Sequence, residues 1–405
     1  MLSRIEIENF KTIDRLKLEL GRTNVFIGEN GAGKSNILEA IALAAAANSG
    51  KLDNEFLFPR GIRITSASLM RPQFDETSQL NPIKIKVTDE SGGSTQFELS
   101  HDNKEYSKWK ANTIHTNMNN EDLFSLSVRE EAEVNPNIVK ELSAALDLLQ
   151  GYISSPPQNK TKPNLEIPKD SILTRITFRT QEKISKLLTG INDFAIFSPE
   201  TSTLRRFDAE GQIEPLGICG EGLQKLLLVL SKEEPKTIKT IKNTLSIFGW
   251  FEDFHFRSES SASHSKVEVI DRFFCKEDSY LDLRGANEGF LYLMFYSALF
   301  ASKLCPKFFA VDNIENSLNP KLCAHLISEI HKVSIVSDKQ SILTTHNPAI
   351  LDGLNLDDDS QRLFAVQRNP DGYTRIKRIH KKHGSELKLS EMFMRGVIGG
   401  LPKGF

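Results

Sequence analysis

The stretch Thr23-Asn24-Val25-Phe26-Ile27-Gly28-Glu29-Asn30-Gly31-Ala32-Gly33-Lys34-Ser35 decides the fold of this chain. Its first five residues are predicted to form a buried strand, and the apolar run over 36–42 is typical of a helix. Residues 28–35 match the pattern G-x-x-x-x-G-K-[ST], whose glycines let backbone N–H groups surround phosphates at a helix N-terminus. A chance glycine-rich turn is the alternative, but strand, loop and helix all occur in the required order. We therefore predict a nucleoside triphosphate site.

The pattern assigns roles within this loop, here called the phosphate loop. Lys34 would reach the β- and γ-phosphates of the nucleotide, and the Ser35 hydroxyl would hold Mg²⁺. The residues expected to bind the nucleotide are Gly28, Glu29, Asn30, Gly31, Ala32, Gly33, Lys34, Ser35 and Asn36.

Composition limits the remaining functions. The chain has 405 residues, of which 39% are hydrophobic and 26% charged, as expected of a globular protein with a sizeable core. A formal net charge of −2 gives no global attraction to nucleic acid, so such a contact would need a local basic patch. The four cysteines show no C-x-x-C spacing, which supports neither a zinc site nor a disulfide framework. Without an apolar signal core or membrane span, we expect a cytoplasmic protein with no membrane contact.

The chain divides by pattern into three parts. Residues 1–100 carry the phosphate loop and short alternating strands, which predict an antiparallel β lobe beside the nucleotide core. Residues 101–195 are polar with little alternation and are expected to form a helical insertion. Residues 196–405 would complete the α/β core around a mixed sheet.

The element predictions are as follows. Strands are expected over 2–8, 16–20, 23–27, 62–64, 83–87, 95–99, 194–198, 267–270, 279–283, 307–311, 340–343, 362–367 and 373–379. Helices are expected over 36–47, 138–149, 174–188, 220–231, 288–304 and 320–333.

A second acidic site should complete the magnesium position. Phe308-Phe309-Ala310-Val311-Asp312 is an apolar run of strand length that ends in an aspartate. In phosphate-loop proteins such a carboxylate holds Mg²⁺ from a strand beside the loop's own strand. We therefore expect Asp312 to lie on the metal side of the site.

At this point three blocks resemble one family. The phosphate loop with Ile7-Glu8-Asn9-Phe10-Lys11 before it resembles the ABC-type ATPase heads of the SMC, RecF and OLD families. Residues 309–320 resemble their Walker B and D-loop segments, and Leu343-Thr344-Thr345-His346-Asn347-Pro348 resembles their switch-histidine segment. The resemblance implies an ABC-type head that closes head-to-head on a second copy, in a dimer or higher oligomer, around ATP and Mg²⁺. Residues 101–195 show no such match.

The family's signature segment would complete the partner's site. The matching stretch is Arg284-Gly285-Ala286-Asn287-Glu288-Gly289-Phe290, with Asn287 in place of the usual serine and Gly289 allowing close approach. A plain helix N-cap at Asn287 is the alternative, and both roles can coexist.

The main departure from the family is Asn313, which stands where glutamate usually polarises the attacking water. An amide cannot act as a general base, so the resemblance implies slow or partner-stimulated hydrolysis. Glu315 could substitute if the strand continued through it, since residues 313 and 315 would then share a face. His346 would contact the γ-phosphate.

Other residues remain open between two interpretations. Gln73 would be either the family's Mg²⁺-contacting glutamine or an ordinary loop residue. Lys11 would likewise either lie near the nucleotide or have no part in the site. Asp357-Asp358-Asp359 is expected to be a solvated loop. The basic run over 375–383 could touch DNA or RNA phosphates, or form a solvated face or a protein contact.

These patterns lead to three hypotheses. The first is an ATP-dependent switch subunit that controls a separate effector, such as a nuclease or toxin, in a bacterial anti-phage system. Only 59 residues follow His346, too few for an appended TOPRIM nuclease domain, so the effector is expected on another chain. The second hypothesis is a RecF-like DNA-binding ATPase in repair. The third is an ATP-bound scaffold with little or no turnover.

Overall fold

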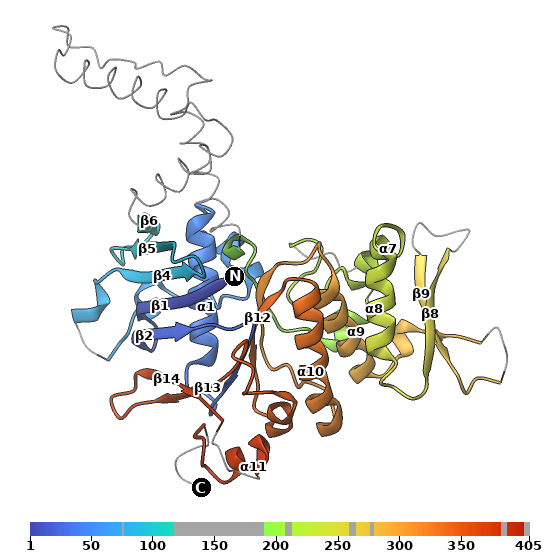
Figure 1. Cartoon of the computed structure of the whole chain (residues 1–405). Helices are drawn as coiled ribbons and strands as arrows, with labels where there is room; N and C mark the ends of the chain where they lie inside the picture. The colour runs from blue at the N-terminus through green and yellow to red at the C-terminus, as the bar shows by residue number, and fades with distance from the viewer. Residues whose placement is uncertain are drawn as a thin grey trace, which may run out of the picture.

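The computed structural model describes residues 1–74, 77–116, 190–206, 213–258, 265–275, 279–381 and 387–400. These residues form an α/β structure with three sheets (Figure 1). The helices predicted over 138–149 and 174–188 lie outside the described residues.

The central sheet carries the phosphate loop. Its strands run in the order β14 (Thr374–Ile379), β13 (Gln361–Arg368), β3 (Thr23–Ile27), β12 (Gln340–Thr344), β11 (Phe308–Val311) and β7 (Ile196–Phe197). All pairs are parallel except the hairpin β13–β14, so the sheet is mixed as predicted. Since the carboxyl ends of parallel strands meet at one edge, the segments after β3, β11 and β12 come together there.

The side sheet is antiparallel and lies next to the phosphate-loop helix. Its strands run in the order β2 (Ile13–Glu19), β1 (Leu2–Phe10), β4 (Ile83–Asp89), β5 (Ser94–Ser100) and β6 (Lys110–Thr116). Residues 62–64 are not a strand, which corrects that prediction. The range of β6 falls at the start of the segment predicted to be a helical insertion, so that part is strand instead.

Two hydrophobic cores lie on the two faces of β3. Phe26 faces helix α1 (Lys34–Asn48) and the side sheet, whereas Val25 and Ile27 face the helices on the other side. This alternation follows from the two-residue period of a strand. Because α1 is covered by both sheets, its residues from Ile37 to Ala47 are all buried, which explains a helix without a polar face.

The second core is built from helices. It contains α7 (Leu223–Glu233), α8 (Pro235–Leu245), α9 (Glu288–Ala301) and α10 (Pro320–Val336). Figure 1 shows these helices on the side of the central sheet away from the side sheet, with β8 and β9 beyond them. The outer sheet has the order β10 (Leu281–Asp282), β9 (Ser265–Asp271) and β8 (Phe251–Ser258).

Some boundaries differ from the sequence predictions for local reasons. Helix α7 begins at Leu223 rather than 220, because Gly220 and Gly222 take left-handed φ values of 105° and 78°. The strand predicted over 279–283 is reduced to β10 and a 3₁₀ turn, and β7 is shorter than its predicted range. Helix α8 and strand β8 were not predicted.

The short elements complete the described chain. They are α2 (Asn54–Leu57), η1 (Phe58–Arg60), η2 (Ala67–Met70), η3 (Thr77–Gln79), α6 (Thr201–Leu204), η4 (Leu283–Gly285), η5 (Pro348–Gly353) and α11 (Leu389–Met394). Among all described helices, none has the length and apolar character that crossing a membrane requires.

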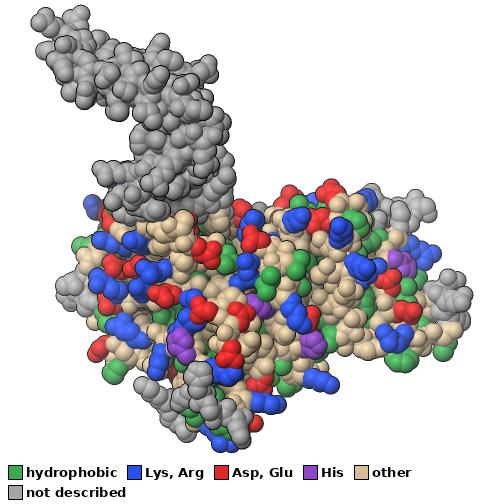
Figure 2. All heavy atoms as spheres, viewed as in Figure 1, with side chains coloured by type: hydrophobic (Ala, Val, Ile, Leu, Met, Phe, Trp, Pro, Cys, Tyr) green, Lys and Arg blue, Asp and Glu red, His purple; other side chains and the backbone are tan. Residues whose placement is uncertain are grey.

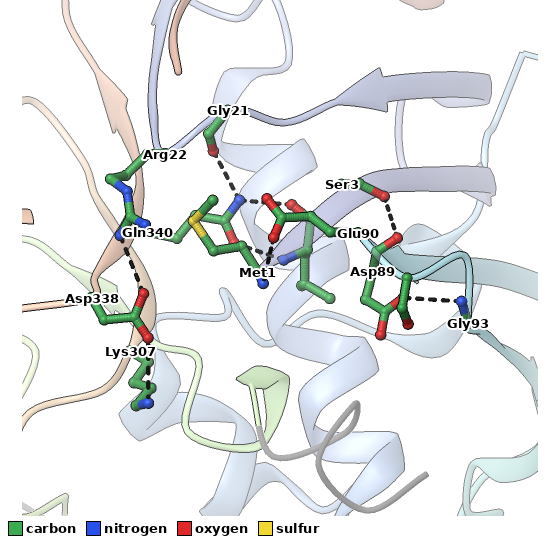
Figure 3. A network of polar contacts seen from close by, with 12 residues as sticks. Met1, Ser3, Gly21, Arg22, Asp89, Glu90, Gly93, Lys307, Asp338 and Gln340 are labelled. Atoms are coloured by element: carbon green, nitrogen blue, oxygen red, sulfur yellow. Dashed lines mark hydrogen bonds and ion pairs between the residues drawn. The ribbon is translucent and has the colours of Figure 1, made fainter. Parts of the chain in front are cut away.

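One buried glutamine ties the side sheet to the central sheet. The Gln340 side chain accepts from the Leu2 N–H at 3.0 Å and donates to the Leu2 and Gly21 carbonyls at 2.7 and 2.8 Å (Figure 3). Arg22 and Lys307 both reach Asp338 close by, at 3.4 and 3.5 Å. The start of β1 is thereby fixed to the start of β12.

Candidate nucleotide-binding site

The phosphate loop needs its glycines for two separate reasons. Gly31 and Gly33 have φ values of 78° and 106°, a region that side chains rarely adopt. A Cβ on Gly33 would also lie only 2.1 Å from the Thr374 hydroxyl oxygen. Helix α1 begins directly after it, at Lys34, so its free N–H groups point into the loop. This is the geometry of a phosphate cradle.

Lys34 lies folded across the loop. Its ammonium donates to the carbonyls of Gly28 at 2.8 Å and Glu29 at 3.1 Å. Burial lowers the pKa of Lys34, while the carboxylates of Asp312, Glu315 and Glu29 act in the opposite direction. Two of these carboxylates, those of Asp312 and Glu315, lie in the segment after β11. The Lys34 ammonium is therefore close to the negative charges of the predicted metal site.

Ser35 and Asp312 meet as the pattern of a magnesium site requires. The Ser35 hydroxyl donates to Asp312 Oδ2 at 3.4 Å, and the Thr344 hydroxyl donates to Asp312 Oδ1. Ser35 lies in the first turn of α1, Asp312 directly follows β11, and Thr344 ends β12, so the three oxygens lie at the same sheet edge. Hydroxyl and carboxylate oxygens with room for water suit Mg²⁺, which binds through few protein ligands. The residues present therefore fit the metal that the family implies.

The segment after Asp312 leaves the strand at once. β11 ends at Val311, and Asn313 has a left-handed φ of 54°. Its backbone N–H donates to the Thr344 hydroxyl at 2.9 Å. Asparagine tolerates this conformation better than most residues. The condition under which residues 313 and 315 would share a strand face is therefore not met, because no strand continues through them.

Glu315 and His346 lie next to each other. Glu315 Oε1 accepts the backbone N–H of His346 at 2.8 Å, which joins the Walker B segment to the switch segment. Burial lowers the pKa of His346, and the nearby Lys34 ammonium lowers it further, against the carboxylates of Glu315 and Asp312. The imidazole is therefore held in its neutral form at neutral pH.

The signature-like segment has the N-cap that the sequence suggested. Asn287 Oδ1 accepts the Phe290 N–H at 2.9 Å, while Asn287 itself is exposed. A Cβ on Gly289 would lie 3.2 Å from the Ser317 carbonyl oxygen. Ser317 donates to the Glu288 carboxylate at 2.9 Å. The D-loop and the first turn of α9 are therefore in direct contact within one chain.

The sequence predicted Lys11 near the nucleotide and Gln73 on the metal side. The Lys11 ammonium pairs with the buried Glu39 carboxylate on α1, one turn after Ser35. Gln73 is exposed, and its amide donates to carbonyls of its own loop, including that of Ser68 at 2.7 Å. These contacts place Lys11 beside helix α1. They also occupy the Gln73 amide with hydrogen bonds inside its own loop.

The structure adds contacts that the sequence did not reveal. Arg368, at the end of β13, donates from Nε to the Gly31 carbonyl at 2.8 Å. Thr374, on β14, donates to the Ala32 carbonyl at 3.0 Å. Thr344 stood inside the switch-segment match and could have been found there, whereas Arg368 and Thr374 had no local signal.

The acidic run and the basic run pair with each other. Asp359 binds Arg362 and Arg378, and Asp357 binds Lys381. Asp358 is also engaged, because its carboxylate lies 3.1 Å from His331 Nε2. Residues 357–359 lie in a largely exposed loop, as expected, but their carboxylates are paired with basic side chains. On the face that Figure 2 shows, basic and acidic side chains are interspersed, without a continuous basic strip.

Comparisons with known proteins agree with this geometry. Residues 1–351 match the family model described as AAA ATPase domain. An uncharacterized protein of Methanocaldococcus jannaschii is 46% identical over 67 residues, which cover 15% of this chain and 31% of that protein. The DNA replication and repair protein RecF of Listeria welshimeri serovar 6b is 42% identical over 55 residues, 13% of this chain and 15% of RecF. The similarity thus spans less than a third of either relative.

A solved structure extends the likeness to the fold. An Smc head bound to the C-terminal winged-helix domain of ScpA superposes with a TM-score of 0.50 at 14% identity, covering 94% of this chain and 98% of the other. That likeness shows the fold alone. With the phosphate loop, the contact of Ser35 with Asp312 and the family match together, the chain belongs to the AAA ATPase domain family as an SMC/RecF-like ABC-type ATPase.

Proposed function

We propose that this protein is an ATP-driven switch subunit whose two copies close head-to-head around ATP and Mg²⁺. The observation that carries the proposal is the network of Ser35, Asp312, Thr344 and Asn313 at the end of the central sheet. This network provides residues that would bind ATP and Mg²⁺. The position of the general base, however, carries the amide side chain of Asn313. Binding ATP tightly and turning it over slowly suits a switch, because the closed state then lasts.

The second copy would supply the missing half of each site. Asn287 and Glu288 are exposed at the N-terminus of α9, where they are free to approach another molecule. Their neighbours in the D-loop are Ser317 and Leu318, so the surface offered to a partner contains both segments. In this arrangement Asn287 Oδ1 keeps its N-cap bond while its amide N–H donates toward a γ-phosphate.

The test is assembly and turnover measured together. Wild-type protein with ATP and Mg²⁺ should shift to a dimer or larger species in sedimentation, and Lys34→Ala should abolish both the shift and ATP binding. Lys303→Ala, at an exposed lysine after α9, is the matched control and should behave as wild type. Nucleotide-dependent assembly that survives Lys34→Ala would contradict the switch.

The effector is proposed on resemblance alone. A nuclease or toxin, encoded as a separate chain in a bacterial anti-phage system, would be held or released by the ATP-closed dimer in the cytoplasm. Co-expression with the products of neighbouring genes tests this: a nuclease should co-purify with the wild type and its activity should depend on ATP. An ATP-independent complex would argue against control by the switch.

A RecF-like role in DNA repair is the second candidate. It is favoured by the match to RecF, and it predicts DNA-stimulated ATP hydrolysis with salt-sensitive binding. The pairing of the 375–381 basic residues with aspartates weakens it. Titrating duplex DNA at two salt concentrations separates the two candidates. If ATP hydrolysis is negligible and neither DNA nor a partner protein increases it, the ATP-bound scaffold is the remaining function.

A further inference from the structure

Two buried polar atoms near the switch segment lack hydrogen-bond partners. They are Glu315 Oε2 and the hydroxyl of Tyr296 on α9. Tyr296 is completely buried, and the Glu315 charge contributes to raising its pKa, after burial and Tyr292. Burying a carboxylate oxygen without a hydrogen-bond partner lowers the stability of the folded protein. A glutamate kept at such a position is therefore expected to have a function there.

Glu315 lies among four parts of the molecule. Its other oxygen, Oε1, holds the backbone N–H of His346. Its charge also acts on Lys34 in the phosphate loop and on Cys323 in α10. The carboxylate therefore lies where the loop, the switch segment, α9 and α10 converge.

The same short segment leads onward to the signature-like helix. The Glu315 backbone carbonyl accepts from the Leu318 N–H at 3.0 Å, which closes the turn that presents Ser317. Ser317 then bonds to Glu288 and packs on Gly289. A shift of His346 is thus linked through one turn to the first turn of α9.

We infer that Glu315 is a positioning residue that fixes the His346 backbone and couples it to the signature-like segment, and that it is not the general base. The observations behind this inference are that Glu315 Oε1 accepts the His346 N–H and that Oε2 is buried, so the carboxylate is oriented by the backbone of the switch segment. This inference rests on the proposed ATP switch for its functional consequence, although the contact itself is independent of it.

Two substitutions separate the roles. Glu315→Gln keeps a carbonyl oxygen that can accept the His346 N–H, but cannot act as a base. Glu315→Leu removes the acceptor. For a positioning residue, the Gln variant keeps turnover within about threefold of wild type and the Leu variant loses about tenfold or more. For a base, both variants lose on the order of 100-fold, the usual contribution of general base catalysis, and that result overturns the inference.

Hydrogen exchange at the His346 amide gives a readout that does not need activity. In nucleotide-free protein the amide should exchange slowly in wild type and Glu315→Gln, and at least about tenfold faster in Glu315→Leu. Glu252→Leu, at an exposed glutamate on β8, is the control and should leave the His346 amide unchanged. Equal exchange in wild type and Glu315→Leu overturns the inference. If the exchange pattern holds but wild type neither assembles nor hydrolyses ATP, the proposed switch fails while the contact stands.

Discussion

Arg368 Nε donates to the carbonyl of Gly31 at 2.8 Å, which fastens the apex of the phosphate loop to the end of β13. Arg368 and Gly31 are 337 residues apart in sequence. The loop is therefore braced on the side away from Asp312 by a residue outside the loop motif.

Removing this brace should weaken nucleotide binding without abolishing it. Arg368→Met loses one partly solvated, charge-assisted hydrogen bond, worth about 1 kcal/mol, so ATP affinity should fall roughly fivefold. Titration calorimetry with ATP and Mg²⁺ measures the change. Arg395→Met, at an exposed arginine after α11, should bind as wild type does. An unchanged affinity in Arg368→Met would show that the loop needs no support from β13.

Restoring a carboxylate after Asp312 should accelerate hydrolysis. Asn313→Glu places a base where the family normally has one, and general base catalysis contributes on the order of 100-fold. The gain should be smaller, about tenfold, because glutamate is strained at the left-handed φ of residue 313. Steady-state phosphate release measures it, and Asn313→Gln, which is equally long but uncharged, is the control. A Glu variant no faster than the Gln variant would mean that the local backbone misdirects the carboxylate.

Tyr296→Phe should stabilise the protein. The Tyr296 hydroxyl is completely buried without a partner, so deleting it removes an unsatisfied polar group at nearly constant shape. The expected gain in unfolding free energy is about 1 kcal/mol. Thermal unfolding by calorimetry checks it against Tyr106→Phe, at a tyrosine that is 97% exposed. A destabilised Phe variant would reveal a hydrogen bond to this hydroxyl.

Mild acid should destabilise the fold through His331. Its ring nitrogens lie 2.9 Å from the Thr23 hydroxyl and 3.1 Å from the Asp358 carboxylate. Burial lowers the pKa of His331 below its usual 6.5, and this outweighs the opposing effect of Asp358. The unfolded chain therefore takes up the proton first, and stability decreases as the pH falls below about 6.5.

Asp358 adds a second decrease at lower pH. Burial raises its pKa, but hydrogen bonds from Ser360 and Gln361 outweigh this effect and bring the pKa to about 2. The stability that ionised Asp358 contributes is present above its usual pKa of 3.8 and is lost as the pH falls toward 2.

Denaturant unfolding between pH 7.5 and 5 isolates the effect of His331, and His331→Gln should flatten the curve of unfolding free energy against pH in that range. A curve of equal slope in that variant would assign the loss to other groups.

Much of this structure could be predicted because its signals are local. The phosphate-loop strand lies over 23–27 as expected, and the paired ends of β11 and β12 follow from apolar runs that each end in a polar residue. The α/β class with its mixed sheet and antiparallel side sheet is confirmed. The limits of these strands depend on neighbouring residues, whereas their order in the sheets depends on pairings across the whole chain.

The parts that were missed have two causes. Helix α8 carries a local signal that was overlooked, with Pro235 at its start and Ile238, Ile241 and Leu245 at helical spacing. Asn313 leaves the strand because a distant residue, Thr344, accepts its N–H. Arg368 finds its partner across almost the whole chain. Nothing in the flanking residues encodes such long-range pairs, and the strand that would have put Glu315 on one face with Asn313 ends at Val311.

The double-sided burial of β3 has a mechanical consequence. A strand whose alternate side chains are locked into two separate cores has little freedom to slide or to tilt alone. A displacement of the phosphate loop that moved β3 would therefore disturb the packing of both cores at once, because the side chains of Val25 and Ile27 belong to one core and that of Phe26 to the other.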